Sequence, residues 1–185
     1  MSIAQVEVNG YHLKVFGNTD LLQQKLVGIF CSQKCPGELI LKAFDLAREL
    51  REKQVPVIGG FHSFIEKEML PILMRGTQPI VICLARELES YRIPVEYKSA
   101  LNVGRLLLAS PFSGKGFTRI TQETAILRNR LIGSLSTSIL LVHAQPGGNI
   151  EKLCQEWLSN NRRVFALPGQ GNQHLFDAGV KMWTE

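Results

Sequence analysis

The sequence predicts an α/β fold, with a doubly wound and mostly parallel Rossmann-like sheet and a small N-terminal β-hairpin. Short apolar runs without polar alternation are typical of parallel strands covered on both faces. Segments of helical periodicity separate these runs, and such β–α alternation is the pattern of α/β domains. The 185 residues, 45% hydrophobic and 20% charged, suit one globular domain over residues 1–185 with a sizeable core.

The first expected element is a hairpin over residues 3–16. Apolar and polar residues alternate there around Asn9-Gly10, and Asn-Gly between alternating runs is a strong signal for a two-residue hairpin turn. A brief helix is expected near Leu21–Lys25. The core of the domain then occupies residues 25–180.

Strands and helices alternate through this core. The expected strands are Val27–Cys31, Val55–Ile58, Ile80–Leu84, Leu106–Ala109, Ile139–His143 and Val164–Leu167. The expected helices are Glu38–Lys53, Ser63–Met74, a segment that includes Leu127–Leu135, Ile150–Asn160 and Asn172–Ala178. Pro71 marks a candidate kink in the second helix. The segment Arg86–Val103, which Pro94 interrupts, is the exception to the clean alternation.

The helix that contains Arg-Asn-Arg at positions 128–130 has a charge on its apolar side. Leu127, Leu131, Ile132 and Leu135 define the apolar face, and Arg128 falls inside that arc. Arginine is almost never fully buried unless it is paired. Arg128 therefore meets either a buried carboxylate such as Glu66 or Glu123, or an anion bound at the sheet edge. Arg130 lies on the opposite side, where a solvated surface charge is the default expectation.

Three turns follow expected strands at the edge where a doubly wound sheet binds its ligand: Ser32–Gly37, Gly59–Ser63 and Gln145–Asn149. Two of them contain paired glycines, Gly59-Gly60 and Gly147-Gly148, which permit positive φ angles and a close approach of a ligand to the backbone. Backbone N–H groups and the helix dipole favour a phosphate or carboxylate there. The alternative is that these glycines only make tight strand-to-helix turns.

Composition narrows the function classes. The net charge of +5 attracts polyanions, although the positive residues form no block. No apolar run approaches the roughly 20 residues that span a bilayer, and the N-terminus lacks a signal-peptide pattern, so we expect a cytoplasmic protein without membrane contact. Four scattered cysteines are expected as free thiols, and their spacing predicts no metal site.

Catalysis is not expected. His62 and His143 both follow apolar strands near the expected crevice, so either could hydrogen-bond a ligand. A catalytic histidine needs an orienting carboxylate and a nucleophile, and no nucleophile motif is present. We therefore predict a binding protein with neither catalytic residues nor a cofactor.

Two segments carry a resemblance to a known family. Arg128-Asn129-Arg130-Leu131-Ile132 with Leu135-Ser136, and Val164-Phe165-Ala166 with Pro168-Gly169, resemble the Rossmann-like core of the DNA-processing protein A (DprA/Smf) family. The resemblance covers roughly residues 25–180 and is strongest in the C-terminal half. The family's Gly-Ser-Arg corresponds here to Cys31-Ser32-Gln33-Lys34, and its Ser-Gly-x-Ala-Arg-Gly-Ile-Asp to residues 59–66, so both motif arginines are missing and Glu66 keeps the acid.

The resemblance implies a protein that binds single-stranded DNA, passes it to a RecA-type recombinase during transformation, and forms a homodimer. From the length of 185 residues, we expect the core domain without the family's accessory domains. Phosphates would meet Lys34, Arg128, Arg130 and the turn amides, and Phe61 or His62 would stack a base. The full set of ligand residues expected on this basis is Ser32, Lys34, Gly59, Gly60, Phe61, His62, Arg128, Asn129, Arg130, Gly147, Gly148 and Asn149.

A second resemblance leaves an alternative open. Pro146-Gly147-Gly148 is similar to the Pro-Gly-Gly-x-Gly-Thr-x-x-Glu signature of the LOG (lysine-decarboxylase-like) nucleotide phosphoribohydrolases. Ile150-Glu151 stand where that signature has Gly-Thr, and Cys154 replaces its glutamate. This resemblance implies a module that binds a nucleotide or another phosphorylated ligand without turnover.

Overall fold

The computed structural model describes residues 2–184, and its strands form one nine-stranded sheet. The strands are β1 (Ala4–Val8), β2 (Tyr11–Gly17), β3 (Val27–Cys31), β4 (Val57–Gly59), β5 (Ile80–Cys83), β6 (Leu106–Ser110), β7 (Ser138–His143), β8 (Val164–Ala166) and β9 (Lys181–Met182). The α-helices are α1 (Gly37–Glu52), α2 (Phe64–Met74), α3 (Lys98–Asn102), α4 (Gln122–Leu135), α5 (Asn149–Ser159) and α6 (Gln173–Asp177). Four short 3-10 segments are η1 (Thr19–Gln23), η2 (Val95–Tyr97), η3 (Lys115–Phe117) and η4 (Gln170–Asn172).

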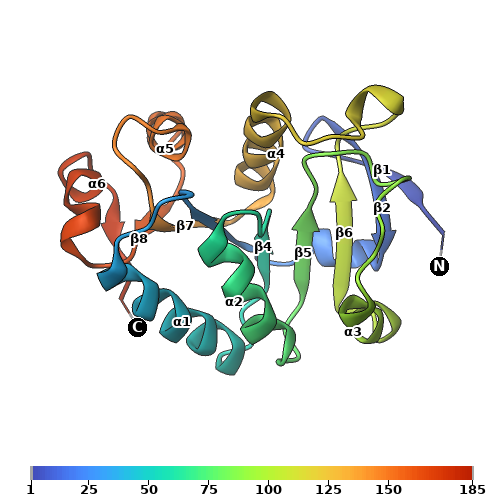
Figure 1. Ribbon diagram of the computed structural model, residues 1–185, viewed down its shortest axis with the longest axis horizontal. Coiled ribbons are helices and arrows are strands. Elements are labelled where there is room, and N and C mark those ends of the chain that lie inside the picture. The colour runs from blue at the N-terminus through green and yellow to red at the C-terminus, as the bar shows by residue number, and fades with distance from the viewer. Residues whose placement is uncertain (1, 185) are drawn as a thin grey trace.

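The sheet confirms the predicted fold class. Its order is β1-β2-β6-β5-β4-β3-β7-β8-β9, and every pair from β6 to β9 is parallel. The N-terminal hairpin forms around Asn9-Gly10, where both residues have positive φ angles, and β2 pairs antiparallel with β6. The hairpin therefore extends the parallel sheet at one end, opposite the edge strand β9 (Figure 1).

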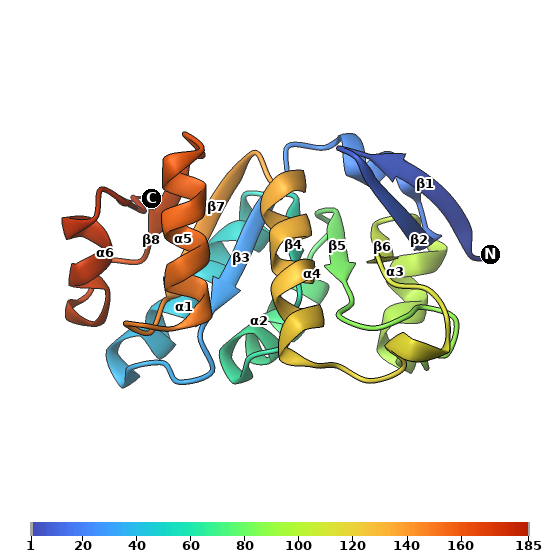
Figure 2. The ribbon, with the colours of Figure 1, turned by 90° about the horizontal axis from the view of Figure 1, so that it is seen from above.

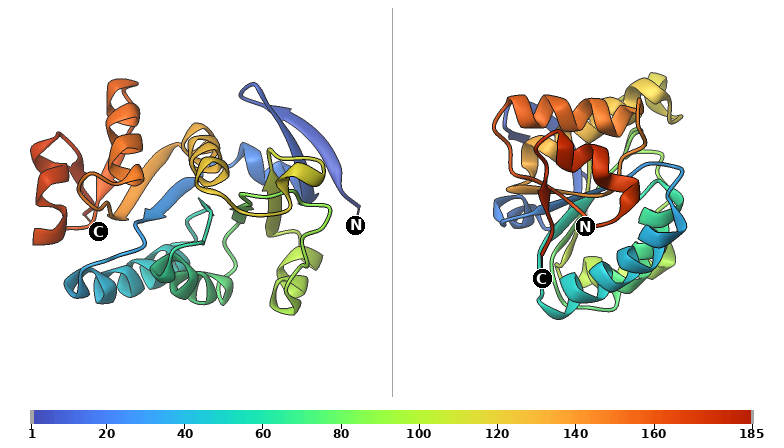
Figure 3. Two further views of the ribbon diagram at one scale, coloured as in Figure 1. Left: turned by 45° about the horizontal axis from the view of Figure 1, so that its top comes forward. Right: turned by 90° about the vertical axis from the view of Figure 1, so that its left-hand side faces the viewer.

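Helices cover both faces of the sheet, which explains why the central strands are apolar without alternation. Figures 1 and 3 show α1, α2 and α3 on one face and α4, α5 and α6 on the other. The first layer packs on a core that includes Ile29, Leu39 and Met69. The second packs on a core that includes Phe30, Leu131 and Trp157. Successive residues of β3 thus point into different cores, as the period of a strand requires.

The topological switch point lies between β3 and β7. Strands β4, β5 and β6 follow on one side of β3, whereas β7, β8 and β9 lie on the other. The chain leaves the ends of β3 and β7 in opposite directions, toward α1 on one face and α5 on the other (Figure 2). In open α/β sheets this divergence creates a crevice at the carboxyl ends of the strands.

Several local expectations differ from the structure. The brief helix near Leu21–Lys25 is the 3-10 segment η1, and β4 begins at Val57 rather than Val55. Pro71 lies on the exposed side of α2, and the helix continues through it to Met74. Leu127 was expected on the apolar face of α4, but it is 48% exposed, because the buried face of the helix runs through Thr124, Arg128 and Leu131 instead.

The two C-terminal elements close the sheet. Val180 is buried, and β9 pairs with β8. Trp183 packs edge-on against Phe165, with ring centroids 5.6 Å apart. These apolar residues therefore cover the chain's own sheet, although Met182 remains half exposed.

Candidate nucleic-acid interface

A crevice of about 260 Å³ lies at the switch point, between the ends of β3 and β7 and the first turns of α2 and α5. Part of α4 forms another wall. Half of the expected ligand residues line this crevice: Ser32, His62, Arg128, Asn129, Gly148 and Asn149. Its other lining residues include Gln33, Glu66, Ala125 and Gln145, which were not among the expected ligands. Residues up to 119 positions apart, Cys31 and Ile150, therefore meet where the sheet topology places a ligand site.

Ser32 joins the two strand ends that form the floor of the crevice. Its backbone N–H donates to the carbonyl oxygen of His143 at 2.9 Å, and its Oγ accepts the N–H of Gln145 at 2.9 Å. The hydroxyl thus takes a backbone donor that would otherwise face the crevice. Ser32 has a structural role in this position, and its hydroxyl proton remains available to a ligand.

Glu66 places an internal carboxylate at the start of α2. One oxygen accepts the N–H of Cys31 at 2.8 Å, and the other accepts the N–H groups of His62 and Ser63 at 2.8 and 3.2 Å. Ser63 completes the capping box by accepting the N–H of Glu66. Two amides of the Gly59–Ser63 turn, which we expected to hold an external phosphate, are therefore occupied by the protein's own anion. The Ser-x-x-Glu spacing at 63–66 is the sequence signal that could have revealed this.

Arg128 is buried, with 5% of its surface exposed, and it forms no ion pair within residues 2–184. Its Nε donates to Oδ1 of Asn129 at 2.8 Å, and Nη1 donates to the carbonyl oxygen of Cys83 at 3.3 Å. Burial lowers the pKa of the guanidinium, whereas the negative charge of Glu66 raises it. Because an arginine starts from a pKa far above neutrality, the group keeps its charge. Of the two alternatives for Arg128, the ion pair with Glu66 or Glu123 does not form, and contact with a bound anion stays a prediction.

Gly60 makes room for this guanidinium. A Cβ at position 60 would overlap Nη1 and Cζ of Arg128, and it would lie 2.8 Å from Nε. The φ angle of Gly60 is not positive, so the requirement is for space and not for a special backbone conformation. The second glycine of the Gly59-Gly60 pair therefore serves a neighbouring side chain.

The Gly147-Gly148 turn leads into α5. Gly147 has a φ of +73°, and its N–H donates to Oε2 of Glu151 at 2.7 Å. Gly148 caps α5 without a side-chain hydrogen bond. Within the described residues, the N–H groups of Asn149 and Ile150 find no acceptor in the protein. Helix α5 therefore presents unsatisfied first-turn amides to the crevice, and it lacks the side-chain cap that Ser63 gives to α2.

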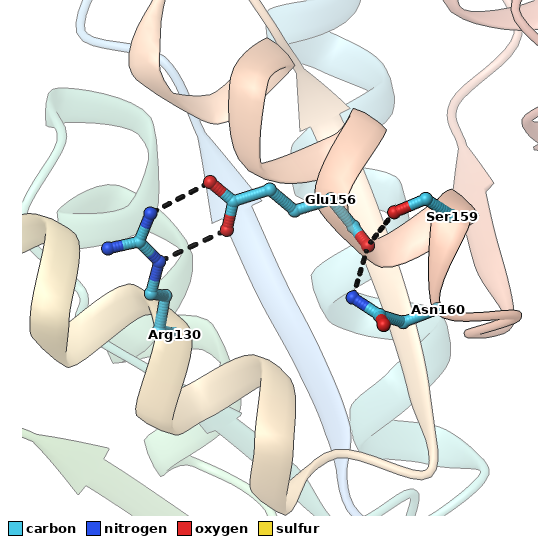
Figure 4. Close-up of polar contacts among 4 residues, drawn as sticks. All are labelled: Arg130, Glu156, Ser159 and Asn160. Atoms are coloured by element: carbon cyan, nitrogen blue, oxygen red, sulfur yellow. Dashed lines mark hydrogen bonds and ion pairs between the residues drawn. The ribbon is translucent and has the colours of Figure 1, made fainter.

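The structure does not bring Arg130 into the crevice. It forms a bidentate ion pair with Glu156 of α5, with distances of 2.8 and 3.0 Å (Figure 4). This pair raises the pKa of Arg130 and lowers that of Glu156. Arg130 instead lines a shallow surface hollow between α4 and α5. Arg130 is therefore a surface charge, which was the default expectation, and it pairs with a residue 26 positions further along the chain.

The remaining expected residues lie near the crevice without lining it. Lys34 is exposed on the loop after β3, and Gly59 is buried beneath the ring of Phe61. Gly60 and Phe61 line a neighbouring pocket, which shares His62 and Arg128 with the crevice. Gly147 is exposed beside the crevice mouth.

His143 also lies outside the crevice lining, in contrast to our expectation. It is buried, and its Nδ1 lies 3.0 Å from Oδ1 of Asn172. The amide nitrogen of Asn172 donates to the carbonyl oxygens of Val142 and Leu167, so its oxygen faces the histidine. Nδ1 of His143 therefore carries the proton and donates it. The histidine helps to join β7 to the segment after β8.

Two further features of the described residues bear on function. No group of three or more His, Cys, Asp or Glu side chains in residues 2–184 is arranged to hold a metal ion. No helix in the same range is long and apolar enough to cross a membrane.

Together, the fold and the crevice define a Rossmann-like α/β protein with a buried arginine and open helix amides at the switch point of its sheet. The family profile of DNA recombination-mediator protein A matches residues 2–185. The chain therefore belongs to the DNA recombination-mediator protein A family, which confirms the resemblance seen in the sequence.

Solved structures support the same assignment at the level of the fold. DNA processing protein A from Streptococcus pneumoniae has a TM-score of 0.76 and 21% identity over 94% of this chain and 63% of that chain. This chain thus spans less than two thirds of the pneumococcal protein. A structure of the Helicobacter pylori protein, described by its single-stranded DNA binding mode, has a TM-score of 0.78 and 17% identity over 98% and 90% of the two chains.

A more distant likeness connects the fold to small-ligand proteins. The molybdenum cofactor binding protein of Rippkaea orientalis has a TM-score of 0.60 and 11% identity, over 88% of this chain and 90% of that chain. Among curated proteins, no sequence matches this chain significantly.

Proposed function

We propose that this protein binds single-stranded DNA along the carboxyl edge of its sheet and places a phosphate in the crevice. The observation that carries the proposal is the guanidinium of Arg128, which is buried without an acidic partner and shares a pocket with the open amides of α5. A buried charge is costly unless something compensates it. A phosphate in the crevice would form the direct ion pair that Arg128 lacks and accept the N–H groups of Asn149 and Ile150.

The loops beside the crevice support a polyanion as the ligand. The loop after β3 contributes Lys34, and the loop after β6 contributes Lys115 and Arg119. All three are exposed, and neither loop contains an aspartate or glutamate over residues 32–36 and 111–121. A strand that follows the sheet edge would pass these cations on either side of the crevice. This arrangement suits a chain of phosphates better than a single one.

Binding without catalysis is the form of activity that the site supports. His62 has a pKa lowered by burial and by the charge of Arg128, so its ring is neutral at physiological pH. Its sequence neighbour Ser63 uses its hydroxyl to cap α2. No activated nucleophile therefore results from this pair.

A salt titration with oligonucleotides tests the proposal. For a single strand, the slope of log K against log salt is about −0.7 per phosphate contact. We expect binding that strengthens with oligonucleotide length and a slope that becomes less steep in Lys34→Glu. Lys25→Glu makes the same change of charge at the opposite end of β3, and Lys25 lines neither the crevice nor the neighbouring pocket, so it is the matched control. Binding that is indifferent to length, or equal effects of the two variants, would refute the proposal.

The second candidate is a module that binds a nucleotide or phosphorylated small ligand in the crevice without turnover. The unoccupied amides at the start of α5 favour it, because one phosphate satisfies them as well as a strand does. Cys154, at the position of the acid in the LOG signature, is buried and does not line the crevice. Tight binding of one mononucleotide that does not strengthen with oligonucleotide length would favour this candidate.

We also propose, from family membership, that the protein is a cytoplasmic homodimer whose partner is a RecA-type recombinase. The exposed side chains of Leu127 on α4 and Met182 on β9 are apolar surface that a second protein could cover. Light scattering at high micromolar concentration tests self-association, and a monomer under those conditions would exclude the homodimer.

A further inference from the structure

A second and larger pocket lies beside the crevice, with a volume of about 480 Å³. We call it the tyrosine pocket. One wall is the C-terminal part of α2, including Met74, with Arg75 just after it, and the other is the segment after β5, including Arg86, Tyr91 and Tyr97. Its volume falls in the range of about 300–1,000 Å³ that is typical of small-molecule sites. The segment that forms the second wall is the one that interrupted the β–α alternation of the sequence.

Two aromatic side chains line this pocket opposite an apolar wall. Tyr91 and Tyr97 are both partly buried, and α2 contributes Pro71 and Met74 on the other side. Burial raises the pKa of both phenols, so both remain protonated at neutral pH and can donate a hydrogen bond. Flat aromatic surfaces of this kind stack on the π-face of a planar ring, and such stacking is possible with any nucleic-acid base.

The polar lining of the tyrosine pocket is mainly cationic. Lys67, Arg75 and Arg86 line it, and none of them forms an ion pair within residues 2–184. Glu96 is the acidic residue in the lining, and it is exposed. A ligand that is anionic at one end would be attracted here.

Arg86 adds an independent indication of a missing partner. Its Nη2 donates to Oγ of Ser90 at 3.1 Å, and its backbone carbonyl accepts the hydroxyl of Ser110 at 2.6 Å. Its Nε is buried and has no acceptor. Buried donors are nearly always satisfied, so the unpaired Nε shows that the hydrogen bonds of Arg86 are incomplete. The bond to Ser90 orients the side chain, and its buried Nε keeps an unpaired N–H.

We propose that the tyrosine pocket binds one nucleoside phosphate unit, with the base between the tyrosines and α2 and the phosphate near Arg75 and Arg86. The combination of aromatic surface, an apolar wall and unpaired cations in one cavity fits this ligand class. The unit can be a free nucleoside monophosphate or one nucleotide of a single strand. The proposal concerns a different cavity from the crevice, and it does not require the crevice to bind DNA.

Isothermal titration calorimetry tests the proposal with deoxyadenosine, deoxyadenosine 5′-monophosphate and a 20-residue single-stranded oligonucleotide. Arg75→Glu reverses an exposed cation of the pocket, and Tyr91→Leu removes a planar ring while keeping an apolar side chain. Lys25→Glu is the charge-matched control, and circular dichroism verifies that each variant folds. We expect both pocket variants to weaken binding by about tenfold and the control to have no comparable effect.

The ligands separate the possible results. Binding of the monophosphate but not of the nucleoside, weakened by both pocket variants, supports a free nucleotide as the source. Binding of the oligonucleotide alone, weakened by the same variants, supports a nucleotide within a strand. If ligands bind but neither pocket variant weakens them, the tyrosine pocket is not the site, whatever Lys34→Glu shows for the crevice. If none of the three ligands binds, the proposal for the tyrosine pocket and the proposal for the crevice are both overturned.

Discussion

The fit between Gly60 and Arg128 yields a quantitative prediction for Gly60→Ala. The new methyl group would overlap the guanidinium, which must move and lose its hydrogen bond to the carbonyl oxygen of Cys83. Hydrogen bonds from charged groups contribute about 1.5–3 kcal/mol. Replacing glycine by alanine at an unstrained position recovers about 0.4–1 kcal/mol by restricting the unfolded chain. The net expected loss of stability is about 1–2 kcal/mol.

A double-mutant cycle isolates the contact from other effects of the substitution. In an Arg128→Ala background the overlapping atoms are absent, so Gly60→Ala should be neutral or stabilise the protein by up to about 1 kcal/mol. Urea denaturation of the four proteins provides the free energies of unfolding. A cost of Gly60→Ala that is equal in both backgrounds would show that the methyl group does not act through Arg128, and the reasoning about the crevice wall would be refuted.

The other predictions concern Arg130 and two titrating side chains. Arg130→Ala should reduce stability by at most about 1 kcal/mol, because the ion pair is exposed, and should leave oligonucleotide affinity unchanged in the same calorimetric assay. Burial lowers the pKa of His143 from 6.5, so the unfolded chain binds the proton more readily. The contribution of His143 to the free energy of unfolding should therefore be fully present above about pH 6.5 and fall on acidification. Urea denaturation at pH 7.5 and 5.5 should show a smaller fall in the free energy of unfolding for His143→Gln. Cys35 has a pKa lowered by a hydrogen bond from Cys31, so brief iodoacetamide treatment at pH 7 should modify Cys35 before the three buried cysteines, as mass spectrometry can measure.

The sequence by itself determined the fold class and the family. Apolar runs without alternation identified the parallel strands, and Asn9-Gly10 identified the hairpin, because both signals depend on residues that are close together in the chain. The helical period also placed Arg128 on the buried side of α4, and the structure has it there. The Arg-Asn-Arg pattern indicated the family for the same reason, since a motif within one element needs no knowledge of its neighbours.

Only the tertiary structure decided what these residues contact. Arg130 meets Glu156 because α4 and α5 lie side by side on one face of the sheet, and nothing near Arg130 in the sequence indicates that partner. Glu66 reaches the amide of Cys31 because β3 and β4 are neighbours, which turns an expected phosphate site into an internal contact. The tyrosine pocket likewise arises between α2 and a segment without clear periodicity. Strand order brings these groups together, and local patterns of hydrophobicity do not encode strand order.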